Sequence, residues 1–169
     1  DKALIAVGVQ GNIEDLGLEK CNISVEKGWI KVNEYLETSL AGVYAIGDVA
    51  GPPWLAHKSS AEGIIASEHI AGLNPDPMKY DNIPGCTYCH PEVASVGLTE
   101  KSAKEKGYEI KIGNFPFRGL GKSMAVGDTD GFVKVIYDAK YGEMLGCHII
   151  GAEATNLITE AVIARNLET

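Results

Sequence analysis

The chain has 169 residues and a net charge of −8, from 15 basic and 23 acidic side chains. Apolar residues make up 45% and charged residues 22%, a balance that argues against bulk disorder. The densest basic stretch, residues 101–106, is interrupted by Glu105, so we expect no nucleic-acid partner. No apolar run approaches the roughly 20 residues of a membrane span, so we expect no membrane partner.

The first half of the chain has the pattern of an α/β lobe. Residues 4–9 are an apolar run that predicts a buried strand, and residues 28–32 alternate as in a half-exposed strand. Residues 42–48 predict a second buried strand that ends in Gly-Asp. Residues 56–71 predict a helix that Gly72 ends. We expect its apolar face to contain Ala61, Ile64, Ile65 and Ile70.

The second half has the pattern of an antiparallel sheet with helices. It follows a Pro-rich break at residues 74–77. We expect Thr99 to cap a short helix that stops at Gly107. A final helix is predicted over residues 152–165, with Leu157, Ile158, Ala161 and Val162 on one face. Strands are predicted at residues 86–89, 94–98, 108–115, 132–138 and 144–150, and the last two should form a hairpin.

The predicted fold class is therefore α+β, with helices on one face of an antiparallel sheet. It is preceded by the closing strands and helix of an α/β lobe. We place the incomplete lobe at residues 1–81 and the second domain, truncated at its C-terminal end, at residues 82–169. The chain lacks an initiator Met and begins within an apolar run. On this basis we expect it to be a fragment of a longer protein.

The most specific stretch of the sequence is residues 38–63. It reads Thr-Ser-x-x-Gly-Val-Tyr-Ala-Ile-Gly-Asp, followed by Leu-Ala-His-Lys and Glu-Gly. This resembles the second flavin motif of the pyridine-nucleotide disulfide oxidoreductases. Residues 91–100, 131–134 and 145–151 agree in order along the chain. Within that family the segments are most similar to the members that oxidise protein-bound dihydrolipoyl groups.

The resemblance implies an FAD-binding role for the lobe and NAD as the electron acceptor of the parent enzyme. It assigns Asp48 to the ribityl chain and the Leu55-Ala56-His57 backbone to the flavin ring. A strand that ends in Asp48 can aim a carboxylate at a hydroxyl, and a helix beginning near Ala56 directs its positive end at the flavin. Near residue 10 the sequence departs from the family pattern, because Val9 replaces a basic residue and Gly11 a proline.

Several parts of such an enzyme are missing from the sequence. It has no Gly-x-Gly-x-x-Gly loop after a first strand, and no two cysteines four residues apart. The His-x-x-x-x-Glu spacings at His57–Glu62 and His148–Glu153 lack the proline context of the family's acid/base pair. We therefore expect no catalytic residue in this chain. We also expect it to be inactive by itself and to bind no FAD tightly.

The resemblance also implies partners. We expect homodimerisation through residues 82–169, and in the parent enzyme lipoyl-bearing components of a 2-oxoacid dehydrogenase or glycine-cleavage complex. Four sparse cysteines favour a cytoplasmic origin. The alternatives are another reductase of the family, of glutathione or mercury type, and a stand-alone dimerisation module without chemistry.

Two further motifs have competing interpretations. Cys86 and Cys89 form a Cys-x-x-Cys that would suit a redox pair or half of a zinc site. On a strand, however, positions i and i+3 face opposite ways, which favours two packed or interface thiols and no metal site. The Gly-rich residues 118–127 could pass for a phosphate loop. A long hairpin connection is favoured, because strand patterns lie on both sides.

Overall fold

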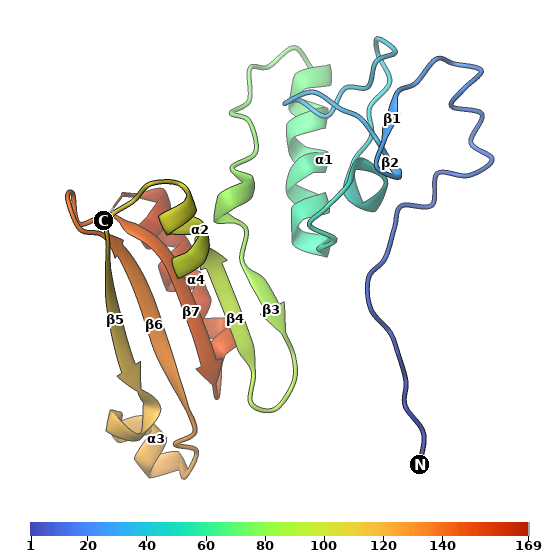
Figure 1. Cartoon of the computed structure of the whole chain (residues 1–169). Helices are drawn as coiled ribbons and strands as arrows, with labels where there is room; N and C mark the ends of the chain where they lie inside the picture. The colour runs from blue at the N-terminus through green and yellow to red at the C-terminus, as the bar shows by residue number, and fades with distance from the viewer. Residues whose placement is uncertain (169) are drawn as a thin grey trace. The chain divides into compact units, whose positions relative to one another are not determined.

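A computed structural model describes residues 1–168, and its secondary structure divides into two compact units (Figure 1). The first unit ends at Met78 and the second begins at Lys79. The first contains β1 (Val25–Glu26), β2 (Trp29–Ile30), the 3₁₀ turn η1 (Gly47–Ala50) and α1 (Ala56–Ile70). The second contains η2 (Tyr80–Asn82), β3 (Gly85–Thr87), β4 (Val93–Gly97), α2 (Glu100–Glu105), β5 (Ile110–Pro116), η3 (Phe117–Gly119), α3 (Gly121–Val126), β6 (Gly131–Asp138), β7 (Met144–Gly151) and α4 (Ala154–Asn166).

Two predicted strands of the first unit are wrong. Residues 4–9 form no secondary structure, and Leu4 is 92% exposed. Residues 42–48 make an isolated bridge between Glu37 and Tyr44 and then enter η1. A strand needs a hydrogen-bonded neighbour, and within residues 1–168 no segment pairs with residues 4–9. Of the strand predicted at residues 28–32, only β2 forms, and it pairs with β1.

Helix α1 has the predicted length but a different buried face. Ile64 and Ile70 of the predicted apolar face are 61% and 64% exposed. The buried residues are instead Lys58, Glu62 and Ala66, spaced four apart. The apolar-face prediction is therefore wrong, because polar hydrogen bonds described below hold the inner face. Gly72 ends the helix as predicted, with φ 77° and an amide that donates to the His69 carbonyl.

The second unit is a five-stranded antiparallel sheet in the order β3-β4-β7-β6-β5. β6 and β7 form the predicted hairpin, and β7 is hydrogen-bonded on both sides. The Gly-rich residues 118–127 lie in the connection between β5 and β6, as part of η3 and α3. The hairpin-connection prediction is therefore confirmed.

Helix α4 covers one face of this sheet (Figure 1). Its residues Ala154, Ile158 and Ala161 are buried against strand residues, and Leu157, predicted on that face, is 38% exposed. The main core cluster is Ala94, Val96, Phe117, Cys147, Ile149, Ala154, Ile158 and Ala161. A second cluster of Ala103, Ile136 and Leu145 packs α2 against the sheet. The predicted α+β class is confirmed, but the expectation that the helices lie on one face of the sheet is wrong, because α4 and α2 pack on opposite faces. Because Val135 and Ile136 are adjacent in β6 and face opposite ways, the two clusters lie on opposite faces.

Gly97 of β4 pairs with Gly146 of β7. A Cβ atom at Gly146 would lie 2.1 Å from the Leu98 carbonyl oxygen, and one at Gly97 would lie 2.3 Å from the Leu145 carbonyl oxygen. Gly97 also has φ 78°. Both positions therefore require glycine, because a side chain there would displace backbone atoms.

Both helices that follow β4 and β7 have side-chain caps. Thr99 accepts a hydrogen bond from the Ser102 amide and begins α2, as predicted, and Gly107 ends its C-terminal turn with φ 85°. At α4 the cap comes from outside the helix. The Glu92 carboxylate accepts from the Thr155 amide at 3.0 Å and from the Thr155 hydroxyl at 2.7 Å. These two hydrogen bonds hold the pKa of Glu92 below its ordinary value.

The core of the second unit can be tested by truncating one α4 side chain. Ile158 is 1% exposed, so Ile158→Ala should lower the free energy of unfolding of the chain by about 2–5 kcal/mol. Urea denaturation followed by circular dichroism measures this. Leu157→Ala is the matched control on the same helix, with an expected loss below about 1 kcal/mol. Equal losses for both variants would contradict the described packing of α4.

The Glu92 cap predicts a dependence of stability on pH. A carboxyl whose pKa is lowered by folding stabilises the protein above its unfolded pKa of about 4.3, and that stabilisation is lost as the pH falls through the lower folded value. Glu92→Gln should therefore make the free energy of unfolding less dependent on pH below about 4.3. The measurement is urea denaturation at several acidic pH values. Glu160→Gln, at an exposed α4 position, is the control and should leave the pH profile unchanged.

Candidate functional site

Asp48 lies in the 3₁₀ turn η1, between two glycines with positive φ. Gly47 has φ 74° and Gly51 φ 101°, so both adopt conformations that L side chains rarely take. The Gly51 amide donates to the Asp48 carbonyl at 3.2 Å and closes the turn. A Cβ atom at Gly51 would lie 3.0 Å from the Trp29 ring. The turn therefore directs the Asp48 side chain to the surface, where it is exposed.

Leu55, Ala56 and His57 form the start of α1, five residues after η1 ends. Leu55 is the N-cap, with extended backbone angles, and no side chain caps the helix there. The first intrahelical bond runs from the Ser59 amide to the Leu55 carbonyl. The amides that precede this bond lie at the positive end of the helix. This end of α1 can therefore bind an electron-rich group through backbone amides.

Lys58 and Glu62 of α1 make hydrogen bonds to η1, a role that sequence reasoning did not predict, although both residues belong to the flavin motif. The Lys58 ammonium donates to the Gly47 carbonyl at 3.0 Å, the Gly51 carbonyl at 3.0 Å and a Glu62 carboxylate oxygen at 3.1 Å. The same Glu62 oxygen accepts from the Gly47 amide at 2.7 Å. Both side chains are buried, at 0% and 1% exposure. The three donors of the ammonium are matched by three acceptors, as a buried charge requires.

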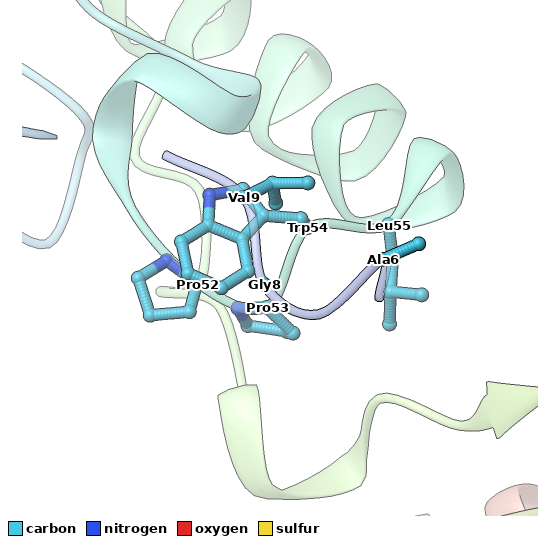
Figure 2. A pocket seen from close by; sticks show the side chains of 7 residues that line it. All are labelled: Ala6, Gly8, Val9, Pro52, Pro53, Trp54 and Leu55. Atoms are coloured by element: carbon cyan, nitrogen blue, oxygen red, sulfur yellow. The ribbon is translucent and has the colours of Figure 1, made fainter. Parts of the chain in front are cut away.

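A mostly apolar pocket adjoins the start of α1 (Figure 2). The Trp54 indole nitrogen is buried and has no hydrogen-bond partner among the described residues. Gly11 lies close by in the same unit, where a Cβ atom would be 3.0 Å from the Asp48 carbonyl oxygen. Figure 2 shows the N-terminal segment passing beside the loop before α1. The pocket is lined by Ala6, Gly8, Val9, Pro52, Pro53, Trp54 and Leu55.

The structure separates the two cysteines of the Cys-x-x-Cys motif. Cys86 lies in β3, packs against the main core cluster and is half-buried. Cys89 lies beyond the end of β3 and is exposed, so the prediction of a strand over residues 86–89 is wrong at its end. Among residues 1–168 no group of three His, Cys, Asp or Glu side chains is placed to hold a metal ion. Burial, and then the nearby Glu92 carboxylate, raise the pKa of the Cys86 thiol.

The two His-x-x-x-x-Glu spacings lie in different elements of the fold, one within α1 and the other between β7 and the start of α4. Glu62 belongs to the buried pair with Lys58, whereas His57 is exposed on the first turn of α1. His148 lies in β7, with its Nε2 atom 3.0 Å from the Leu98 carbonyl oxygen. Glu153 has φ 61° and precedes α4.

The thiol environments predict an order of reactivity. Cys21 and Cys89 are exposed, whereas Cys147 is buried and its pKa is raised by burial. Because the thiolate is the reactive form, a short pulse of iodoacetamide near neutral pH should label Cys21 and Cys89 first, then Cys86, and Cys147 last. Peptide mass spectrometry gives the order. The control is the urea-unfolded chain, in which the four rates should converge. Rapid labelling of Cys147 in the folded chain would contradict its placement in the core.

Comparison with known proteins follows the same division of the chain. Residues 83–169 match the sequence model of the pyridine nucleotide-disulphide oxidoreductase dimerisation domain. Residues 1–63 match the model described as pyridine nucleotide-disulphide oxidoreductase. Among residues 1–168, no helix has both the length and the apolar character needed to cross a membrane.

Curated relatives cover the chain from end to end. The dihydrolipoyl dehydrogenase of Rhizobium etli is 55% identical over 100% of this chain and 35% of its own length. Those of Zymomonas mobilis and Bacillus subtilis are 52% and 49% identical over 99% of this chain, and over 36% and 35% of their own lengths. The chain therefore spans about a third of the length of these relatives.

Solved structures share the fold. LpdA from Mycobacterium tuberculosis matches with a TM-score of 0.89 and 25% identity, over 98% of this chain and 36% of that one. RclA, a HOCl-induced flavoprotein disulfide reductase from Escherichia coli, matches with a TM-score of 0.87 and 25% identity, over 96% of this chain and 38% of that one. The match to the dimerisation-domain model spans half of the sequence, so this chain belongs to the pyridine nucleotide-disulphide oxidoreductase family.

Proposed function

We propose that the whole protein of which this chain forms part is an FAD-dependent oxidoreductase that oxidises protein-bound dihydrolipoamide and reduces NAD. The observation that carries the proposal is the identity of 49–55% to three dihydrolipoyl dehydrogenases over essentially the full chain. Each of these relatives is named a dihydrolipoyl dehydrogenase. The chain contributes a flavin-contacting segment and a dimerisation domain, and by itself it is inactive.

The geometry of η1 and α1 suits one end of a flavin. The exposed Asp48 carboxylate can accept a hydrogen bond from a ribityl hydroxyl. The backbone of Leu55, Ala56 and His57 presents the positive end of a 15-residue helix, which favours the negative charge that a flavin acquires on reduction. Bound FAD would supply the two-electron chemistry between thiols and the nicotinamide. These few contacts support the proposal that the isolated chain binds FAD weakly.

Residues 1–81 are proposed as the end of the nicotinamide lobe and the closing part of the FAD-binding lobe, and residues 82–169 as the interface domain. Homodimerisation through residues 82–169 is supported by the dimerisation-domain match. It is also supported by large apolar side chains that the second unit leaves exposed on and around β5 and β6: Ile112, Phe115, Met124, Val126 and Phe132. Burying such side chains between two subunits removes them from water.

The partners and location of the whole protein complete the proposal. Its substrates are lipoyl groups carried by components of a 2-oxoacid dehydrogenase or glycine-cleavage complex. A cytoplasmic location is supported by the four free cysteines, Cys21, Cys86, Cys89 and Cys147.

A second candidate is another disulfide reductase of the same family, of glutathione or mercury type. The structural similarity to a flavoprotein disulfide reductase at 25% identity is the observation in its favour. The test uses the full-length protein, and follows NADH formation from free dihydrolipoamide and NAD. Rapid turnover supports the first proposal. Turnover of glutathione disulfide or mercuric ion with NADPH, and none with dihydrolipoamide, would replace it with the second.

The Asp48 assignment is tested in the same full-length protein. Asp48→Ala should raise the dissociation constant of FAD roughly 10- to 100-fold, because a hydrogen bond to a charged group is worth about 1.5–3 kcal/mol. Titration of the apoprotein with FAD, followed by flavin fluorescence, measures the constant. Glu68→Gln on α1, remote from η1 in the helix, is the control. Unchanged FAD affinity in Asp48→Ala would refute the assignment of Asp48.

A further inference from the structure

Helix α1 buries two opposite charges, Lys58 and Glu62, on its inner face. Lys58 and Glu62 are 0% and 1% exposed, and their nearest charged atoms are 3.1 Å apart. An i,i+4 pair of opposite charges can stabilise a helix while both side chains remain in water. Burial removes both groups from water, and that cost is offset only where additional hydrogen bonds complete their coordination. The arrangement therefore calls for an explanation beyond helix stability.

The additional hydrogen bonds are all made to the two glycines that flank Asp48 in the turn η1. The Lys58 ammonium donates hydrogen bonds to the carbonyl groups of Gly47 and Gly51, and the Glu62 carboxylate accepts one from the amide of Gly47. Between these two glycines lies Asp48, whose side chain is exposed. Glycine adopts positive φ angles readily, so Gly47 and Gly51 permit this turn but do not fix it, and the turn needs a restraint from elsewhere. The buried pair supplies that restraint from the helix side.

We infer that Lys58 and Glu62 are positioning residues, which fix the Asp48 carboxylate relative to the start of α1. The inference rests on the proposed flavin site. Two cofactor contacts come from separate elements, Asp48 from η1 and the backbone amides from α1. Their separation is set by the three-point attachment of the Lys58 ammonium rather than by the loop between them. Neither positioning residue has to touch the cofactor for its loss to weaken binding.

A double-mutant cycle in the full-length holoenzyme distinguishes positioning from general stability. Lys58→Met removes all three hydrogen bonds and leaves a side chain of similar length. It should raise the dissociation constant of FAD at least about tenfold when Asp48 is present. In an Asp48→Ala background the same substitution should change the constant by less than about twofold, because the group that it positions is absent. The readout is apoprotein titration by flavin fluorescence.

The matched control is Ala66→Gly, which lies on the same buried face of α1 one turn beyond Glu62 and has no side-chain hydrogen-bonding group to offer η1. It lowers the thermal midpoint and should leave FAD affinity within about twofold of the native protein. If Lys58→Met does not fold, Glu62→Gln replaces it in the cycle, since the amide oxygen preserves the shape and removes the charge.

Each outcome has one meaning. Strong coupling of Lys58→Met to Asp48→Ala, with no effect of Ala66→Gly, supports the positioning role. The positioning role is overturned in favour of general destabilisation if Lys58→Met raises the dissociation constant of FAD by the same factor with and without Asp48. It is also overturned if Ala66→Gly loses as much FAD affinity as Lys58→Met. A native full-length protein that binds no FAD refutes the proposed function itself. Native binding that Asp48→Ala leaves unchanged refutes the Asp48 assignment, and the positioning role with it.

Discussion

A strand is stable where its backbone finds a hydrogen-bonded neighbour, and this requirement separates the two halves of the chain. β7 has β4 on one side and β6 on the other, so its amide and carbonyl groups are paired along its length. It therefore serves as the centre on which α4 packs. Residues 4–9 are as apolar as β7, but nothing within residues 1–168 pairs with them. They remain extended and exposed for that reason.

The main helix of each unit is consequently fixed in a different way. The second unit buries Ile, Val, Ala, Phe and Cys side chains between a sheet and a helix, and hydrophobic burial dominates its stability. The buried inner face of α1 in the first unit is formed by a lysine, a glutamate and an alanine. Hydrogen bonds of defined direction connect this face to η1, and the first unit also buries the apolar side chains of Ile30, Leu36 and Ala45. Such hydrogen bonds specify geometry more narrowly than apolar packing does, because each polar atom must meet a partner.

This difference suits the roles proposed for the units. A dimerisation domain needs a rigid sheet with apolar side chains left for a second subunit, and close glycine contacts at Gly97 and Gly146 draw the central strands together. The Glu92 carboxylate adds a polar connection between the start of β4 and the start of α4. A cofactor-contacting turn needs a fixed carboxylate at the surface instead. The hydrogen bonds from the adjacent helix α1 can fix such a carboxylate with only two side chains.

Sequence reasoning was accurate where the determining interaction is local. Thr99 caps α2 through a residue three positions away, and Gly72 ends α1 through its own backbone angle. The β6–β7 hairpin likewise follows from a short turn between two apolar runs. The flavin motif identified the family because its residues are contiguous. All of these features were predicted from segments of a few residues.

Features that depend on distant partners were predicted poorly. The apolar run at residues 4–9 indicated a strand, but pairing depends on a neighbour that a local pattern does not reveal. Lys58 and Glu62 have the spacing of an exposed ion pair, and their burial depends on where Gly47 and Gly51 lie in space. The sequence by itself determined the cap of α2, the end of α1, the β6–β7 hairpin, the α+β class and the family of this protein, because these follow from local periodicity, caps and contiguous motifs. Tertiary structure alone decided which strands find partners and which charges are buried, because both depend on contacts between residues far apart in the chain or on different elements.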